Sequence, residues 1–197
     1  MTPDFQRALA FVLKAEGGYT NHPADRGDPT NKGILQREYD QYRRDNGLPA
    51  ADVRHILQTE VEDIYLHDYW LAGRCDRMPW PVSLAHFDAC VNTGVTQAAK
   101  FLQRTVGTRD DGLIGPFTLG ALTAALKRES PGALAGRLAR PRIAFYRELA
   151  KRDPEQRVFL QGWLNRVSNI ERFTGILNET TQDPTKSCAP ISPESLL

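Results

Sequence analysis

Apolar residues recur at helical spacing along most of the chain, and this periodicity argues against a sheet as the main scaffold. The clearest example lies near the C-terminus, where apolar side chains follow one another every three or four residues: Phe159, Trp163, Val167, Ile170, Phe173 and Leu177. A stripe of this kind buries one face of a helix. We find no run of alternating apolar and polar residues of any length, so the sequence predicts a mainly α fold.

The ends of several helices can be predicted from capping residues. Thr2 and Pro3 are typical of an N-cap and a first helical residue, and Gly17-Gly18 is typical of a helix end. Further helices are predicted over 35–46, 59–72, 83–92, 96–106, 116–128, 132–152 and 155–177. Pro141 is expected to break one of them, and Thr59 to Glu62 has the pattern of a capping box. The segment up to Gly33 is predicted to be a loop with short extended pieces.

Composition and charge exclude several classes of protein. A net charge of +1 over 197 residues indicates no nucleic-acid partner. The three cysteines, Cys75, Cys90 and Cys188, are odd in number and lack zinc-site spacing, so we expect neither a disulfide framework nor a metal site. No apolar run approaches the ~20 residues of a membrane span. The N-terminus is too charged for a signal peptide, which predicts cytoplasmic synthesis and export, where it occurs, through a holin or another route.

A carboxylate stands where the first predicted helix meets a loop rich in turn residues, EGGYTNHPADRGDPTNKG. Glu16 continues the apolar stripe of Phe5, Leu9 and Val12. Desolvation on this face and the negative end of the helix dipole both favour the protonated acid. A general acid needs such a proton, although a Glu16 side chain that turns into solvent is the alternative.

Two further carboxylates follow in the same loop, Asp25 and Asp28. Aspartate in such a loop is typical of a turn. A second carboxylate opposite Glu16 would instead suit glycoside hydrolysis, because one group protonates the leaving oxygen while the other orients water or stabilises the transition state. The spacing does not choose between Asp25 and Asp28.

The loop resembles the signature of the glycoside hydrolase 108 family, which comprises N-acetylmuramidases of phage endolysins and related bacterial proteins. The resemblance rests on Glu16–Tyr19 (EGGY), Asn21, Pro23 and Asp25, and Thr30–Ile34 (TNKGI). Further matching positions are Tyr65, Tyr69, Trp70, Cys75, Asp76, Phe87, Asp88, Val91, Asn92 and Gly94. The later run FLQRTVGTRDDGLIGPFTLGAL resembles the peptidoglycan-binding segment of such proteins.

This resemblance implies a lysozyme-like helical fold with a loop-rich catalytic segment and a packed C-terminal helical subdomain. We expect a catalytic muramidase lobe over 1–92, a peptidoglycan-binding-like subdomain over 93–178 and a tail over 179–197. The substrate implied is bacterial peptidoglycan, cleaved by a monomer without metal or cofactor. Glu16 would be the catalytic acid. Similarity to phage-type lysozymes adds Asp25 and Thr30, which would hold a water molecule.

Residues expected to bind the sugar are Tyr19, Asn31, Trp70, Asp88 and Asn92. Core packing is the alternative for Trp70, and an internal polar pair is the alternative for Asp88 and Asn92. Two rival functions stay open. The first is a lytic transglycosylase, which needs one catalytic acid and no attacking water molecule. The second is a non-catalytic peptidoglycan-binding or secretion-accessory protein, which needs no catalytic residue.

Overall fold

The computed structural model describes residues 1–20 and 28–175, and it confirms the mainly α prediction. Its α-helices are α1 (Pro3–Glu16), α2 (Gln36–Asp45), α3 (Gln58–Ile64), α4 (Val82–Thr93), α5 (Val95–Val106), α6 (Pro116–Leu126), α7 (Pro131–Arg152) and α8 (Arg157–Thr174). Shorter turns of helix are η1 (Val53–His55), η3 (Cys75–Arg77) and η4 (Pro154–Gln156), and η2 (Tyr65–Leu71) is a π-helix. Strands β1 (Thr30–Asn31) and β2 (Ile34–Leu35) form an antiparallel hairpin, with Asn31 opposite Ile34.

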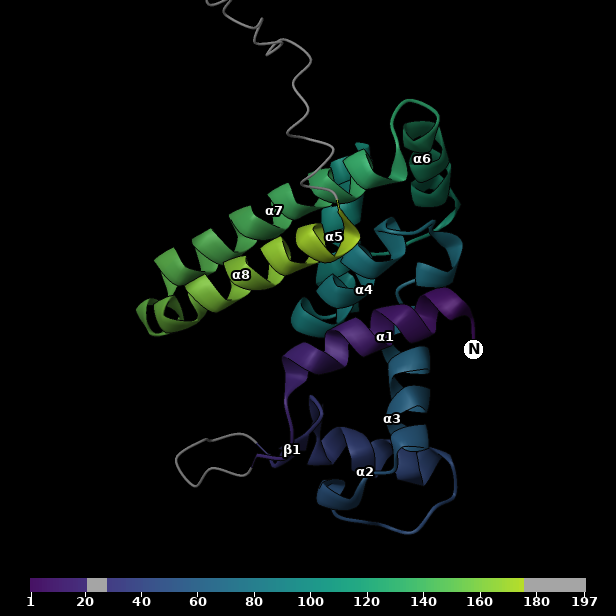
Figure 1. Ribbon diagram of the computed structural model, residues 1–197, viewed down its shortest axis with the longest axis vertical. Helices are drawn as coiled ribbons and strands as arrows, with labels where there is room; N and C mark the ends of the chain where they lie inside the picture. The colour runs from purple at the N-terminus through teal and green to yellow at the C-terminus, as the bar shows by residue number, and fades with distance from the viewer. Residues whose placement is uncertain (21–27, 176–197) are drawn as a thin grey trace, which may run out of the picture.

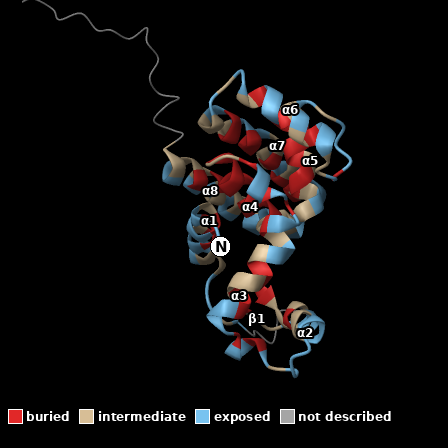
Figure 2. Ribbon diagram, turned by 90° about the vertical axis from the view of Figure 1, so that its right-hand side faces the viewer, coloured by how far each residue is buried: buried red, intermediate tan, exposed pale blue. Residues whose placement is uncertain are grey.

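Helix α4 is the centre of the larger part of the molecule. Helices α1, α5 and α7 pack against it, and α8 lies along α7 (Figure 1). From Val82 to Cys90 every residue of α4 is buried, which is typical of a helix enclosed on all sides. Figure 2 shows the buried positions on the inward faces of the surrounding helices. Among the described residues, no helix is both long and apolar enough to cross a membrane.

Helix α1 follows its sequence signals closely. The Thr2 hydroxyl accepts a hydrogen bond from the Phe5 amide at 3.4 Å, as an N-cap should. The buried face consists of Phe5, Ala8, Leu9 and Val12. The helix ends at Glu16, where Gly17 adopts a φ of 73° that favours glycine. Capping and periodicity therefore place Glu16 in the last turn.

Two predicted helix features are wrong. Helix α7 continues through Pro141, because its packing against α4, α5 and α8 outweighs the lost main-chain hydrogen bond, which costs about 3 kcal/mol. The capping interaction of α3 also lies earlier than predicted. There the Leu57 amide donates to the carboxylate of Glu60 at 2.9 Å, so Glu60 and not Glu62 closes the first turn.

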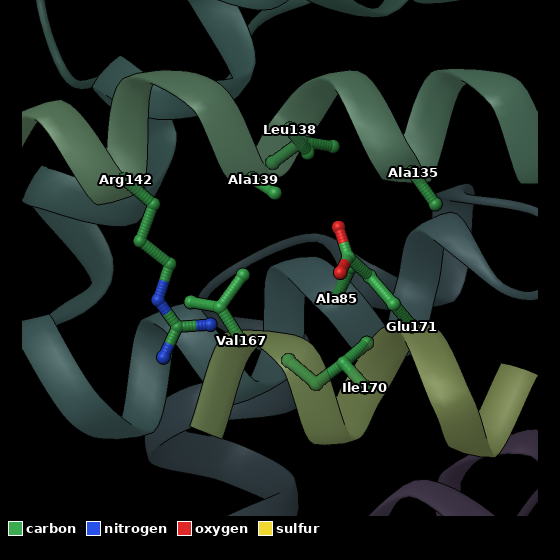
Figure 3. Close-up of a pocket in the computed structure, with 8 residues that line it drawn as sticks. All are labelled: Ala85, Ala135, Leu138, Ala139, Arg142, Val167, Ile170 and Glu171. Carbon is green, nitrogen blue, oxygen red and sulfur yellow. The ribbon is translucent and has the colours of Figure 1, made fainter. Parts of the chain in front are cut away.

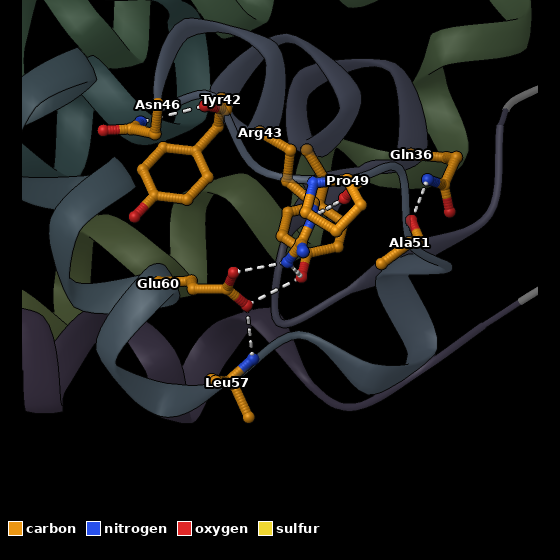
Figure 4. Close-up of polar contacts among 9 residues, drawn as sticks. Gln36, Tyr42, Arg43, Asn46, Pro49, Ala51, Leu57 and Glu60 are labelled. Carbon is orange, nitrogen blue, oxygen red and sulfur yellow. Dashed lines mark hydrogen bonds and ion pairs between the residues drawn. The ribbon is translucent and has the colours of Figure 1, made fainter.

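Helices α2 and α3, with the hairpin, form a smaller lobe on the other side of α1 (Figure 1). A buried carboxylate holds this lobe together (Figure 4). Glu60 accepts from the Tyr39 hydroxyl at 2.7 Å and pairs with Arg43 at 2.7 Å. Gln36 adds bonds to the Ala51 carbonyl at 2.8 Å and from the Val53 amide at 2.7 Å. These contacts fix the base from which the hairpin reaches the end of α1.

Candidate active site

Glu16 is half-buried at the point where α1 meets the hairpin, η2 and α8. Its side chain is 19% exposed, and its Oε1 atom is 2.7 Å from a terminal nitrogen of Arg166. Arg166 belongs to α8, near the opposite end of the sequence. The carboxylate that ends the first helix therefore has a cation from the last helix as its closest charged partner.

The hairpin turn closes over the other side of Glu16. Gly33 has a φ of 79°, and a Cβ atom at this position would lie 2.9 Å from Glu16 Oε2 and 2.6 Å from the Tyr65 hydroxyl. Only glycine fits such a close approach without a shift of its neighbours. The Tyr65 hydroxyl donates to the Lys32 carbonyl at 2.8 Å, which ties η2 to the same turn.

Tyr65 stays a neutral hydrogen-bond donor beside the carboxylate. Burial raises the pKa of Tyr65, and the charge of Glu16 raises it further. The turn at Gly33 and the Tyr65 ring thus form a neutral wall that restricts where the Glu16 carboxylate can point.

Arg166 is shared between Glu16 and a second, fully buried carboxylate. Its Nε donates to Asp88 Oδ1 at 2.8 Å, and Asp88 Oδ2 lies 2.7 Å from a terminal nitrogen of Arg142. Arg142 Nε donates to the Tyr146 hydroxyl at 2.7 Å, and that hydroxyl donates to the Asn92 side chain. The chain of contacts joins α1, α4, α7 and α8.

The charges within this network cancel. Two carboxylates, Glu16 and Asp88, face two guanidinium groups, Arg142 and Arg166. Burial by itself would lower the pKa of Arg166, but the charges of Asp88 and Glu16 outweigh this effect and raise it. Arg166 therefore stays a cation in the interior.

The surroundings of Glu16 differ from the apolar setting that its helix face predicts. The guanidinium of Arg166 lies 2.7 Å from one of its carboxylate oxygens, and this contact fixes the position of the side chain. The alternative of a side chain free in solvent is also wrong, because only 19% of it is exposed.

The loop after Glu16 is closed by main-chain bonds between Thr20 and Thr30, at 2.8 and 3.0 Å. Their hydroxyl oxygens are also 3.0 Å apart. Asp25 lies outside the described residues, so the structure does not place it. Asp28, the competing second acid, forms an exposed ion pair with Arg37 at 3.3 Å.

Three of the residues expected to bind sugar lie in the interior, because packing and polar contacts occupy them. Asp88 is 0% exposed and Trp70 2% exposed, with Trp70 packed edge-on against Phe87. Asn31 is 9% exposed and donates to the carbonyls of Val53 and Arg54, both at 3.1 Å. In this conformation the three side chains support the site and offer no surface to a ligand.

The other two expected sugar-binding residues differ in accessibility. Asn92 is half-buried and accepts from Tyr146, so its oxygen is already engaged. Tyr19 is half-buried too, and the Arg54 guanidinium lies 4.6 Å from its ring centre. An aromatic ring with an exposed arginine over it remains able to stack on a sugar.

Sequence reasoning missed the two arginines, Arg142 and Arg166, and gave no role to Gly33. One signal was present for Arg166. It stands three residues after Trp163 and four before Ile170, inside the apolar stripe of the last helix. A charge on a buried helix face must find a partner, and that partner is the acid at the end of the first helix.

A small hollow beside the charged network does not serve as a substrate site. It lies between α7, α8 and α4, and its lining is mainly apolar, with Arg142 and Glu171 at its sides (Figure 3). Its solvent volume is about 10 Å³, about enough for a single water molecule. Burial raises the pKa of Glu171. The hollow is a packing defect beside the charged network.

Two protein families match separate parts of the chain. Residues 9–94 match the family described as Glycosyl hydrolase 108, and residues 97–168 match the family described as Predicted Peptidoglycan domain. The solved structure of SagA from Brucella abortus is similar, with a TM-score of 0.70 and 29% sequence identity. That similarity covers 91% of this chain and 97% of SagA. No curated protein sequence matches the chain.

Proposed function

The chain belongs to the glycosyl hydrolase 108 family over residues 9–94, and from this premise we propose that it cleaves the β-1,4 bond between N-acetylmuramic acid and N-acetylglucosamine. Family and peptidoglycan domain together make it a peptidoglycan hydrolase, and its mainly α, lysozyme-like fold agrees with that class. In our proposal Glu16 is the general acid that protonates the glycosidic oxygen.

The observation that carries the proposal is the enclosure of Glu16. Arg166 holds one carboxylate oxygen at 2.7 Å, while Gly33 and Tyr65 bound the other. Proton transfer to a leaving group requires a carboxyl group within hydrogen-bond reach of it and fixed in orientation. A side chain held from three sides meets the second requirement before substrate arrives.

Arg166 acts in this proposal as a positioning residue. Its guanidinium also bonds Asp88 at 2.8 Å, so its attraction is divided between two carboxylates. A general acid must carry the proton that it donates. Asp88 keeps Arg166 in place when Glu16 becomes neutral.

The second carboxylate is proposed to be Asp25, with Thr30 helping to hold the attacking water. Thr30 lies at the base of the loop that contains Asp25, through its bonds to Thr20. Asp28 is less suitable, since it already pairs with Arg37 on the surface. Inverting glycosidases place a water molecule between substrate and base, and we propose this role for Asp25.

We propose that residues 1–92 form the catalytic lobe and residues 93–178 a peptidoglycan-binding-like subdomain that also completes the active site. Arg166 and Arg142 come from the second segment, yet they bind Glu16 and Asp88 of the first. Residues 1–92 alone would leave both carboxylates without their cations. The proposed tail, 179–197, lies outside the described residues. Tyr19 is the remaining candidate for stacking on the sugar.

Peptidoglycan as substrate places the action of the protein at the cell wall. We propose that the chain reaches the wall through a holin or another export route. We also propose that it works as a monomer. Fractionation of cells with and without a co-expressed holin tests the first of these, and sedimentation of the pure protein tests the second.

Mass spectrometry of purified peptidoglycan after digestion tests the proposed reaction. We expect fragments with a free reducing N-acetylmuramic acid. Reducing N-acetylglucosamine would place the cut at the other bond, and anhydromuramic ends would mean transglycosylation without water. Binding without soluble fragments would show a non-catalytic protein. Digests with Asp25→Asn and Asp28→Asn identify the second carboxylate, and we expect only the former to be severely slowed.

A further inference from the structure

Three ligand-type side chains lie together in the core, apart from the contacts of Glu16. Cys75 comes from η3, while His86 and Cys90 stand one turn apart on α4. All three residues are 0% exposed, and one ligand atom of each lies within 4.8 Å of the other two. Residues i and i+4 share a helix face, and η3 packs on that face of α4.

His86 is oriented by its surroundings as a metal ligand would be. Its Nε2 atom is 3.0 Å from the Gly73 carbonyl, which accepts the ring proton and leaves the lone pair on Nδ1. Metal-binding histidines typically donate their second nitrogen to a backbone carbonyl in this way. Nδ1 is buried and has no hydrogen-bond partner among the described residues, and such an atom needs an explanation.

Gly73 keeps the space beside the two sulfurs open. A Cβ atom at residue 73 would lie 2.7 Å from the Cys90 sulfur and 3.3 Å from the Cys75 sulfur. The chain thus approaches the sulfur pair at a position where any larger residue would collide with it. Two thiols and one imidazole in a closed, apolar setting form a ligand set for soft and borderline cations.

We propose that Cys75, His86 and Cys90 bind one thiophilic metal ion, with Zn²⁺ as the favoured ion. Two thiolates and a neutral imidazole carry two negative charges, which Zn²⁺ cancels, so no net charge stays in the core. Zinc accepts sulfur and nitrogen ligands and occurs with three protein ligands. The fourth coordination position of the ion would be filled by a ligand other than these three side chains. The ion would join η3 to α4, and both elements also pack against the π-helix η2, which carries Tyr65.

Metal content of the full-length protein tests the proposal. The chain is purified under reducing conditions with added Zn²⁺, desalted, and analysed for zinc per chain. We expect about one ion in wild type and in Cys188→Ser, which removes the cysteine outside the described residues. Cys90→Ser, Cys90→Ala and Gly73→Ala should hold at least about tenfold less. Co²⁺ in place of zinc should give thiolate charge-transfer absorption in wild type and in Cys188→Ser, and not in the other three variants.

Two results would overturn the proposal. Equal zinc content in wild type and in both folded Cys90 variants would place the ion elsewhere. Absence of zinc from the wild type would show that the site does not exist. Thiol counting in denaturant then identifies what replaces it. Three reactive thiols would mean free cysteines, and a single one would mean a disulfide between Cys75 and Cys90. If the Cys90 variants fail to fold, a wild-type melting temperature unchanged by added zinc is equally decisive against the site.

Discussion

Replacing Asp88 by asparagine tests the charged network that supports Glu16. Both carboxylate oxygens of Asp88 are engaged, one with Arg166 at 2.8 Å and one with Arg142 at 2.7 Å. Asparagine has nearly the same shape, so the change removes charge without leaving a cavity. Arg142 is only 3% exposed and would lose its ion pair with Asp88, while Arg166 would keep Glu16.

The expected loss in free energy of unfolding follows from the burial of these side chains. Removing one partner of a buried ion pair typically costs 3–5 kcal/mol, because the other charge stays uncompensated. We expect about 3 kcal/mol, since the asparagine oxygen still accepts one hydrogen bond and Arg166 retains a partner. For a chain of this size that corresponds to a fall in melting temperature of roughly 6–12 °C.

A matched control separates burial from charge. Asp110→Asn breaks the pair between Asp110 and Arg104, whose atoms are 2.7 Å apart but whose side chains are 43% and 49% exposed. An exposed pair contributes little to stability, so the melting temperature of Asp110→Asn should change little. Urea unfolding of wild type and both variants gives the two free energies. Equal, small losses for Asp88→Asn and Asp110→Asn would refute the claim that the Asp88 network supports the core.

Three further predictions concern the wall around Glu16. Gly33→Ala should reduce hydrolysis by about 10²-fold, because the added methyl group would displace Glu16. Gly47 has a φ of 65° and no neighbour within 4 Å of an added Cβ atom, so Gly47→Ala should lose stability only. Equal activities of the two variants would contradict the contact between residue 33 and Glu16. Arg166→Gln should lower kcat with little change in KM, since the Glu16 carboxylate loses the contact that fixes its position. Arg104→Gln should leave both unchanged. A loss of stability with unchanged kcat in Arg166→Gln would mean that the role of Arg166 is only structural. Glu16→Gln should lower the free energy of unfolding in urea, because Arg166 loses one of its two carboxylate partners. A higher free energy of unfolding for the variant would contradict a stabilising ion pair.

Local sequence signals predicted the helices well, because capping and periodicity depend on neighbouring residues. They placed Glu16 at the end of α1, and the family signature includes Thr30–Ile34, although it did not predict that these residues form a hairpin over Glu16. The interruptions within helices were predicted less well. Pro141 is tolerated inside α7 because neighbouring helices hold the chain, and periodicity carries no information on that packing.

The partners of Glu16 could not be read from the sequence in the same way. Arg166 lies on the last helix, and its contact depends on how α8 packs relative to α1. Asp88 and Trp70 share types with sugar-binding residues, yet burial gives them structural roles. Cys75 and Cys90 lack a metal-site spacing, and only the packing of η3 on α4 brings them to His86.

The central claim is that Glu16 supplies the proton for cleavage of the glycosidic bond. The most direct test is the rate at which wild type and Glu16→Gln release reducing ends from purified peptidoglycan, with circular dichroism to show that the variant is folded. Glu155→Gln, an exposed change of the same kind, is the control. We predict a loss of at least ~10²-fold for Glu16→Gln and none for Glu155→Gln. A folded Glu16→Gln protein with more than about a tenth of the wild-type rate would contradict the claim, since a general acid at this position could not be replaced by an amide.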